Sequence, residues 1–237
     1  MIIDGRAIAD KRAASLKLKV QSLKRPPKLA IVMIGDDSAS RIYVNLKIKK
    51  AQEVGIETEL RTDLSTDADG IIVQLPGGEN LIGQIPLEKD VDGLRENSPF
   101  LPATVKAILE ILKQVQDDTN GTYVIVGQGK LVGKPLADYL EKNNCKVIRC
   151  DEFTKDLKTE TYKGDILVCA TGTPNLIKAD MVKPGSIVID VGSPKGDVDF
   201  ENVKDIAGAI TPVPGGVGPM TIISLLENVV EAVKIQK

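Results

Sequence analysis

Two residues that could carry proton transfer, Tyr43 and Lys47, lie four positions apart in a segment expected to be helical. That spacing places both side chains on one face of a helix. A lysine with apolar neighbours can have a lowered pKa, and its amine can then accept and return protons. From spacing alone, a solvated helix rich in lysine is the better-supported interpretation. A Tyr-x-x-x-Lys pair also occurs in short-chain dehydrogenases, but there it follows the glycine-rich turn, whereas here it precedes that turn.

The glycine-rich turn is Gly127-Gln128-Gly129, with Gly133 after it, and it directly follows the apolar segment 123–126. A strand that opens into glycines and then a helix lets backbone N–H groups face a pyrophosphate. Asp151 follows the next strand, where an acidic residue can accept hydrogen bonds from the adenosine ribose of a dinucleotide. The spacing Gly-x-Gly-x-x-x-Gly is close to the dinucleotide fingerprint but not identical, so an ordinary tight turn is the alternative.

Three further residues, one with an amide and two with carboxylates, could take part in binding or catalysis. Gln74 lies at the carboxyl end of a buried apolar strand, at the edge where open α/β sheets bind ligands, although a polar strand end that meets water is the alternative. Asp90 and Asp92 lie in an Asp-Val-Asp-Gly turn, for which a simple capped turn is the favoured interpretation.

Composition excludes several classes of function. The 237 residues contain no histidine, which removes Ser-His-Asp and Cys-His nucleophiles and histidine-ligated metals, and we expect no metal site. Cys145, Cys150 and Cys169 form no CxxC pair, which argues against a zinc site or a disulfide framework and favours a reducing cytoplasm. The net charge of −2 and the 3% aromatic content argue against nucleic-acid binding. No apolar run reaches the roughly 20 residues that span a bilayer, and the charged N-terminus does not resemble a signal peptide. We therefore expect a cytoplasmic protein without membrane partners.

The pattern of elements predicts an α/β fold with two domains, an N-terminal α/β domain and a C-terminal Rossmann-like domain with a parallel sheet. Strands are expected at 28–34, 70–75, 123–126, 146–149, 166–170 and 186–191. One helix is expected from N-cap candidates at 36–40 to about Val54, where Gly55 ends it. Others are expected from about Pro135, at 104–116 as a connector before a polar stretch at 117–121, and at 220–235. The predicted boundaries are 1–104 for the first domain and 105–220 for the second, with a C-terminal helix at 221–237 packing back on the first.

Five motifs in order carry a resemblance to a known family. They are Ser38-Ala39-Ser40-Arg41-Ile42-Tyr43-Val44-x-x-Lys47, Val73-Gln74-Leu75-Pro76, Lys89-Asp90-Val91-Asp92-Gly93, Val132-Gly133-Lys134-Pro135 and Thr211-Pro212-Val213-Pro214-Gly215-Gly216-Val217-Gly218-Pro219-Met220-Thr221. Over about residues 28 to 233 the chain closely resembles the bifunctional methylenetetrahydrofolate dehydrogenase/methenyltetrahydrofolate cyclohydrolase family, FolD. The resemblance implies NAD(P)-dependent oxidation of 5,10-methylenetetrahydrofolate and hydrolysis of the methenyl product to 10-formyltetrahydrofolate. It also implies a homodimer, and two domains facing a cleft, with folate on the N-terminal half and the nicotinamide cofactor on the Rossmann half.

The resemblance also implies roles for single residues. Lys47 matches the catalytic lysine, Gln74 the glutamine that positions it, Tyr43 the tyrosine on the aminobenzoyl ring and Asp92 the carboxylate that binds the pterin. The full candidate set comprises catalytic Lys47, Gln74, Tyr43 and Asp92, substrate-binding Tyr43, Gln74, Leu75, Asp92, Pro214, Gly215 and Gly216, and cofactor-binding Gly127, Gln128, Gly129, Gly133, Asp151 and Ser193.

The chain departs from the family in several places. The interval from Tyr43 to Gln74 is shorter than usual, as if a helix were missing, and the stretch from Gln74 to Asp92 is also trimmed. The segment 101–105 replaces the usual Cys-Thr-Pro turn. Gln128 stands for an arginine, Asp151-Glu152 for His-Ser, and Ser193 for an isoleucine. The family commonly uses NADP, but losing the arginine and gaining carboxylates should penalise a 2′-phosphate, so we expect NAD to be favoured.

Two other functions stay open from the sequence. The trimmed N-terminal half allows a dehydrogenase with weak cyclohydrolase activity, in which the methenyl intermediate accumulates. A catalytically silent folate- or nucleotide-binding protein is the third possibility, but such a binder would not need the lysine.

Overall fold

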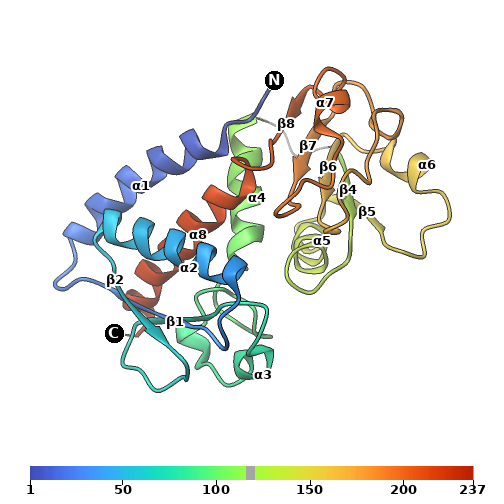
Figure 1. Ribbon diagram of the computed structural model, residues 1–237. Coiled ribbons are helices and arrows are strands. Elements are labelled where there is room, and N and C mark those ends of the chain that lie inside the picture. Colours follow the sequence, from blue (N-terminus) through green and yellow to red (C-terminus); the bar gives the residue numbers. More distant parts are fainter. Residues whose placement is uncertain (116–120, 237) are drawn as a thin grey trace. The chain divides into compact units, whose positions relative to one another are not determined.

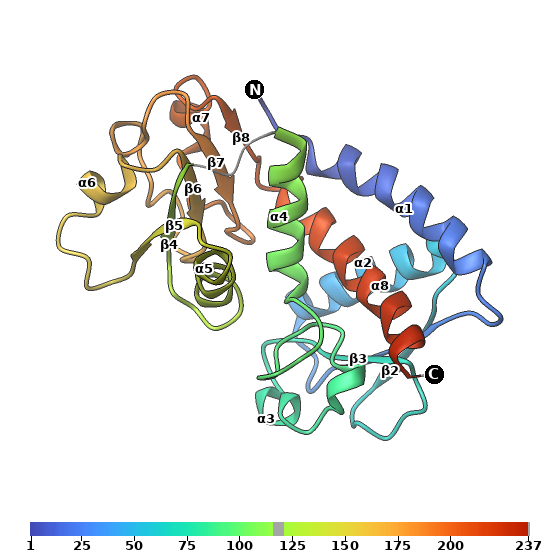
Figure 2. The ribbon, with the colours of Figure 1, turned by 180° about the vertical axis from the view of Figure 1, so that it is seen from behind.

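A computed structural model describes residues 1–115 and 121–236 and divides the chain into two units (Figures 1 and 2). The three-stranded unit consists of Ala9–Ala103 and Thr221–Lys237, and the five-stranded unit of Met1–Ile8 and Thr104–Met220. The predicted polar stretch at 117–121 falls largely outside the described residues, as do Gln116 and Lys237.

The three-stranded unit has a parallel sheet in the order β2-β1-β3, in which β1 is Lys28–Val32, β2 is Glu57–Arg61 and β3 is Gly70–Val73. Both β1 and β3 are apolar and buried, whereas β2 is a charged edge strand. The helices of this part of the chain are α1 (Gly5–Gln21), α2 (Ser38–Val54), α3 (Glu79–Ile82) and α8 (Val217–Ile235), with a short 3-10 helix at Leu87–Lys89. Helices α1, α2 and α8 gather on one side of this sheet (Figures 1 and 2).

The five-stranded unit has a parallel sheet in the order β5-β4-β6-β7-β8. Its strands are β4 (Thr122–Val126), β5 (Lys146–Cys150), β6 (Ile166–Cys169), β7 (Ile187–Asp190) and β8 (Ala209–Ile210). Its helices are α4 (Ala103–Val115), α5 (Gly133–Lys142), α6 (Leu157–Thr161) and α7 (Phe200–Val203), with a 3-10 helix at Ala179–Met181. From β4 the chain adds β5 on one side, and then β6, β7 and β8 on the other side, so the strand order reverses between β4 and β6. This is the strand arrangement of a dinucleotide-binding sheet. The predicted two-domain α/β fold with parallel sheets is therefore confirmed.

The first residues of the chain lie at the edge of the five-stranded sheet. The Ile3 amide donates to the Ile210 carbonyl at 2.8 Å, and the Ile210 amide donates to the Met1 carbonyl at 2.9 Å. Because of this pairing, residues 1–8 group with the five-stranded unit, whereas the sequence prediction assigned them to the N-terminal domain.

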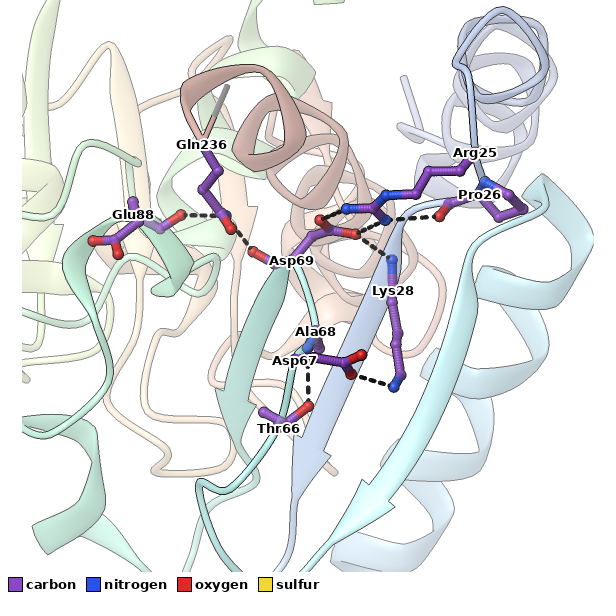
Figure 3. Close-up of polar contacts among 9 residues, drawn as sticks. All are labelled: Arg25, Pro26, Lys28, Thr66, Asp67, Ala68, Asp69, Glu88 and Gln236. Carbon is purple, nitrogen blue, oxygen red and sulfur yellow. Dashed lines mark hydrogen bonds and ion pairs between the residues drawn. The ribbon is translucent and has the colours of Figure 1, made fainter.

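A buried carboxylate, Asp69, joins several segments of the three-stranded unit at the amino end of its sheet (Figure 3). Arg25 donates two hydrogen bonds to this carboxylate, at 2.8 and 2.6 Å, and the Lys28 amide donates a third at 2.8 Å. The Gln236 side chain, just beyond α8, donates to the carbonyls of Asp69 at 2.7 Å and Glu88 at 3.1 Å. These bonds connect the end of the C-terminal helix to the strand edge of the same unit.

In the part of the chain that the structure describes, no helix combines the length and the apolarity needed to cross a bilayer.

Candidate active site

Helix α2 begins and ends where local sequence signals place it, and this fixes the position of Lys47. The Asp37 carboxylate accepts the Ser40 amide at 2.7 Å as the N-cap, and Gly55 ends the helix with a φ of 86°. Glycine suits that left-handed conformation because it has no Cβ. The Ser40 hydroxyl donates to the Leu75 carbonyl at 3.4 Å, which connects the start of α2 to the segment after β3.

The Lys47 amine donates to Gln74 Oε1 at 2.9 Å, so the structure brings together these two predicted residues. Gln74 directly follows β3, is buried, and donates its amide Nε2 to the Leu75 carbonyl at 2.8 Å. Its backbone amide donates to the Val32 carbonyl of β1 at 2.8 Å. The strand end and the amide's own hydrogen bond therefore orient the Gln74 oxygen toward the lysine.

Burial, and not the surrounding charge, favours the neutral form of Lys47. Desolvation lowers the pKa of Lys47 and outweighs the opposing effect of the negative charge on Asp92. Desolvation raises the pKa of Asp92, Lys47 opposes that rise, and the nearby Asp90 adds to it. An amine with a depressed pKa can accept a proton and return it at lower pH than an ordinary lysine can.

Asp90 holds the turn that carries Asp92, in agreement with the capped turn that the sequence favoured. Asp90 is buried, and its carboxylate accepts the amides of Arg95 at 2.9 Å and Leu94 at 3.4 Å. A Cβ on Gly93 would lie 2.7 Å from the Phe100 carbonyl oxygen, so only glycine fits in this turn. The only hint in the sequence was the paired carboxylates of the Asp-Val-Asp-Gly turn.

Tyr43 lies one helical turn before Lys47 on α2 and is 39% exposed. Its ring is thus accessible on the same helix that carries the lysine, as the four-residue spacing predicts.

The glycine-rich turn of the five-stranded unit connects β4 to α5. Gly127 has a φ of 92°, and a Cβ there would lie 2.3 Å from the Ala170 carbonyl oxygen. A Cβ on Gly133 would lie 1.7 Å from the Gly127 carbonyl oxygen, so the turn packs closely on the start of α5. A Cβ on Gly129 would meet nothing within 4 Å, which leaves its backbone open for approach by a ligand.

Gln128 turns back onto its own strand. Its Nε2 donates to the Ile125 carbonyl at 3.0 Å, and its Oε1 is buried without a hydrogen-bond donor among the described residues.

The predicted start of the following helix at Pro135 was two residues late, because α5 begins at Gly133.

Asp151 lies beside the glycine-rich turn, since the Gly127 amide donates to the carbonyl of Cys150 at 2.9 Å. The exposed Asp151 carboxylate accepts the Phe153 amide at 3.0 Å and the Thr154 hydroxyl at 3.3 Å through one oxygen. Glu152 is also exposed. These positions make the surface after β5 rich in carboxylates.

The other predicted residues of the five-stranded unit lie in two loops. Ser193 follows β7, and Pro214-Gly215-Gly216 follows β8. The Gly215 carbonyl accepts the Arg6 amide at 3.1 Å, and a Cβ on Gly5 would lie 1.9 Å from the Gly216 carbonyl oxygen. Within this unit the loop after β8 is therefore tightly packed against the start of α1.

Comparison with known proteins identifies the family. A model described as "Tetrahydrofolate dehydrogenase/cyclohydrolase, NAD(P)-binding domain" matches residues 102–237, and one described as the catalytic domain matches residues 3–65. The chain belongs to the tetrahydrofolate dehydrogenase/cyclohydrolase family.

Individual relatives cover nearly the whole chain. The bifunctional protein FolD of Rickettsia typhi is 42% identical over 277 aligned positions, which include 98% of this chain and 97% of that protein. The crystal structure of the bifunctional enzyme FolD of Campylobacter jejuni is 36% identical, with a TM-score of 0.93 over 100% of this chain and 99% of that one. The Trypanosoma brucei methylenetetrahydrofolate dehydrogenase-cyclohydrolase, complexed with NADP and an inhibitor, is 28% identical, with a TM-score of 0.91 over 100% and 98%. Because 277 positions exceed the 237 residues of this chain, the relative carries residues that are missing here.

The residues of the five-stranded unit fit the nicotinamide cofactor that its domain family implies. Space beside Gly129 precedes α5, where Val132 provides no side-chain cap. The Lys134 amide already donates to the Gly129 carbonyl at 3.1 Å and Pro135 carries no N–H, so among the first residues of α5 the Gly133 amide is the one suited to a pyrophosphate. Among the described residues, no group of three or more His, Cys, Asp or Glu could hold a metal ion.

Proposed function

We propose that this protein is a bifunctional one-carbon enzyme. It oxidises 5,10-methylenetetrahydrofolate to 5,10-methenyltetrahydrofolate with a nicotinamide cofactor, and then hydrolyses the product to 10-formyltetrahydrofolate. The observation that carries this proposal is the hydrogen bond from Lys47 to Gln74 beside Asp92, in a chain that belongs to the family.

In the first step, the bound nicotinamide cofactor supplies the acceptor for a hydride from the methylene carbon. The chain contributes binding and orientation. The backbone at Gly129 and the start of α5 receive the pyrophosphate, and Asp151 receives the ribose. Tyr43 offers an exposed ring for the aminobenzoyl group, and Asp92 a carboxyl group for the pterin.

In the second step, water adds to the methenyl carbon and the ring opens. The added water must lose both protons to become the formyl oxygen: the leaving ring nitrogen gains one, and the other is released to solvent with the positive charge of the methenyl group. The neutral amine of Lys47 accepts the first proton and returns a proton to the nitrogen, while Gln74 keeps the amine in place. Desolvation supports this role because a positively charged lysine would repel the methenyl cation.

A spectrophotometric assay of the purified protein tests the proposal. Methylenetetrahydrofolate and each nicotinamide cofactor should give reduced cofactor, and methenyltetrahydrofolate alone should disappear faster than in a blank without protein. Accumulation of the methenyl intermediate would instead support a dehydrogenase with weak cyclohydrolase activity. Absence of both activities, with retained ligand binding, would support the silent binding protein.

For the cofactor, we propose a preference for NAD over NADP. Gln128 points back to Ile125 and does not replace the arginine that the family uses, while Asp151 and Glu152 add negative charge. Arg149, the nearest cation on β5, is held by Asp138 at 2.6 Å and by Glu141 at 2.7 Å. The ratio of kcat/KM for the two cofactors tests this preference, and an NADP preference above tenfold would overturn it.

We further propose that the three-stranded unit binds folate, that the five-stranded unit binds the cofactor, and that the protein is a cytoplasmic homodimer. Leu75 and Pro214–Gly216 stay predicted substrate contacts, and Ser193 a predicted cofactor contact. The three free cysteines are compatible with a reducing compartment. Sedimentation of the purified chain tests the dimer, because a monomer at micromolar concentration would contradict it.

A further inference from the structure

Two buried carboxylates, Asp190 and Asp197, lie at the carboxyl edge of the five-stranded sheet and belong to none of the predicted site residues. Asp190 is 3% exposed and ends β7, whereas Asp197 is fully buried in the loop that follows. Buried charges are expensive unless hydrogen bonds compensate them, so the contacts of these two carboxylates show what they hold together.

Asp197 connects the loops that follow two neighbouring strands. Its Oδ2 accepts the Thr171 amide at 2.6 Å, the Thr171 hydroxyl at 2.9 Å and the Gly172 amide at 3.1 Å, all just after β6. Its own amide donates to Asp190 Oδ1 at 3.0 Å, at the end of β7. Three hydrogen bonds to the Asp197 side chain therefore join the loop after β6 to the loop after β7, and a fourth ties Asp197 to the end of β7.

The Asp190 carboxylate bonds to backbone amides at both ends of the loop after β7. Its Oδ1 also accepts the Gly192 amide at 2.9 Å, and its Oδ2 accepts the Val198 amide at 3.0 Å. A Cβ on Gly192 would lie 2.7 Å from Asp197 Oδ1, and a Cβ on Gly196 would lie 2.4 Å from Asp190 Oδ2. The loop leaves no room for side chains at these glycines, so the two carboxylates define its path.

The strand order indicates which part of a dinucleotide these loops would meet. The glycine-rich turn follows β4, and Asp151, the ribose candidate, follows β5 on one side of it. A dinucleotide crosses the sheet edge at the point where the strand order reverses, which here lies between β4 and β6. With its adenosine end beside β5, its nicotinamide end lies beside the loops after β6 and β7.

We propose that Asp197 is a positioning residue for the nicotinamide end of the cofactor, because it holds the loop after β6 and the loop after β7 in one fixed arrangement. This inference rests on the proposed dehydrogenase function. Asp197 acts through the backbone of Thr171, Gly172 and the loop that carries Ser193. An amide in place of the carboxylate puts an N–H₂ group at the buried Oδ1 position beside Gly192, where the oxygen accepts no hydrogen bond from the described residues, so we expect Asp197→Asn to disturb this loop.

The test compares two reactions of one protein, because hydrolysis of methenyltetrahydrofolate needs no nicotinamide cofactor. For Asp197→Asn, we expect the Kd for NAD from isothermal titration calorimetry, and the KM for NAD in the dehydrogenase reaction, to rise at least tenfold. The cyclohydrolase kcat/KM should stay within threefold of wild type. Loss of both activities in parallel would show a merely structural role and overturn the proposal, as would an unchanged Kd for NAD.

A matched control is Asp165→Asn, at the opposite edge of the same sheet. Asp165 accepts the Thr122 amide at 2.8 Å and pairs with Lys183 at 2.6 Å, so it also joins segments through a carboxylate. Its substitution should leave the Kd for NAD unchanged, and a rise equal to that of Asp197→Asn would contradict the proposal.

A second variant keeps the proposal testable if Asp197→Asn does not fold. Thr171→Val removes the hydroxyl donor to Asp197 and keeps both amide donors, and it should raise the Kd for NAD about threefold. An unchanged Kd in Thr171→Val would then overturn the proposal. Failure of the proposed function is distinguishable, because the wild-type protein itself would then lack dehydrogenase activity.

Discussion

At the scale of single residues, the lowered pKa of Lys47 connects its burial to the chemistry of the site. A partly buried lysine whose amine bonds to one amide oxygen contributes little to the stability of the fold, since desolvation disfavours its charged form. The same amine is well suited to accept and return protons near a cationic substrate. Function, and not packing, therefore accounts for this residue.

The substitution Lys47→Met separates these two roles. We expect it to lower the cyclohydrolase kcat at least about a hundredfold, the usual contribution of a general acid–base group, without lowering the melting temperature. Turnover with methenyltetrahydrofolate and thermal denaturation measure the two effects. The control is Lys50→Met on the same helix, which loses only ion pairs with Asp10 and Glu53 and should keep full activity. Unchanged turnover in Lys47→Met would refute the role of the amine.

The substitution Asp92→Asn should shift the pH profile of hydrolysis. Asp92 is the negative charge that raises the pKa of Lys47, so its removal lowers that pKa further. Activity that requires the neutral amine rises with pH through the pKa of Lys47, and its midpoint should therefore move to lower pH. The pH dependence of cyclohydrolase kcat/KM, corrected with a blank without enzyme, measures the midpoint. A shift to higher pH would contradict this electrostatic account.

Some of the site could be predicted from the sequence, and some could not. The spacing of Tyr43 and Lys47 and the strand end at Gln74 are local signals, but the spacing alone favoured a solvated helix. The resemblance of the motifs predicted that Gln74 positions Lys47, and the structure joins these two side chains by a hydrogen bond. Asp90 and Asp197 act through hydrogen bonds to loops, and no local pattern distinguishes such carboxylates from ordinary turn residues.

At the scale of elements, local signals fixed α2 well because Asp37 caps it and Gly55 ends it. Strand β2 was missed because Glu57–Arg61 is a charged edge strand with a single large apolar residue, Leu60. Helix α1 was missed as well, since its many charged residues obscure the buried positions that pack inward. Edge position and tertiary packing, which a single sequence does not reveal, decided both elements.

The glycine-rich turn allows a paired prediction. Gly133→Ala should destabilise the five-stranded unit by more than about 2 kcal/mol, because its Cβ would overlap the Gly127 carbonyl. Gly129→Ala should change the free energy of unfolding by less than about 0.5 kcal/mol, since its Cβ meets nothing within 4 Å. Urea denaturation followed by circular dichroism measures both, as the chain has no tryptophan for fluorescence.

The same pair also tests the pyrophosphate site. If backbone at position 129 approaches the cofactor, Gly129→Ala should raise the Kd for NAD several-fold while stability stays unchanged. Equal destabilisation by the two substitutions would show that the open space at Gly129 has no significance.

At the scale of the whole molecule, the chain leaves the three-stranded unit near residue 103 and returns to it at Thr221. The helical spacing of apolar residues in 220–235 predicted a C-terminal helix, but only the structure shows the contacts that secure it. The Asn228 side chain of α8 donates to the carbonyls of Val91 at 3.0 Å and Leu101 at 3.2 Å. Together with Gln236, it connects this returning helix to the turn that carries Asp92.

The Asp69 carboxylate gives the stability of the three-stranded unit a measurable pH dependence. Desolvation acts to raise the pKa of Asp69, but the hydrogen bonds from Arg25 and the Lys28 amide outweigh it, so the pKa lies below its ordinary value. A carboxylate whose folded pKa is depressed stabilises the fold above its unfolded pKa of about 3.9, and this stabilisation is lost as pH falls through the folded pKa. Asp69→Asn should therefore lower the free energy of unfolding at neutral pH by about 1–3 kcal/mol, the usual range for lost hydrogen bonds to a charged group.

The difference between wild type and Asp69→Asn should be constant from about pH 5 to neutral pH and should shrink below about pH 3.9. The matched control is Asp67→Asn, because Asp67 pairs with Lys28 at 2.6 Å but is 86% exposed, and surface ion pairs contribute about 0–1 kcal/mol. Urea denaturation across this pH range measures both variants. Equal destabilisation by the two substitutions, or a difference that grows toward acid pH, would mean that the buried carboxylate does not stabilise this unit through its bonds to Arg25 and the Lys28 amide.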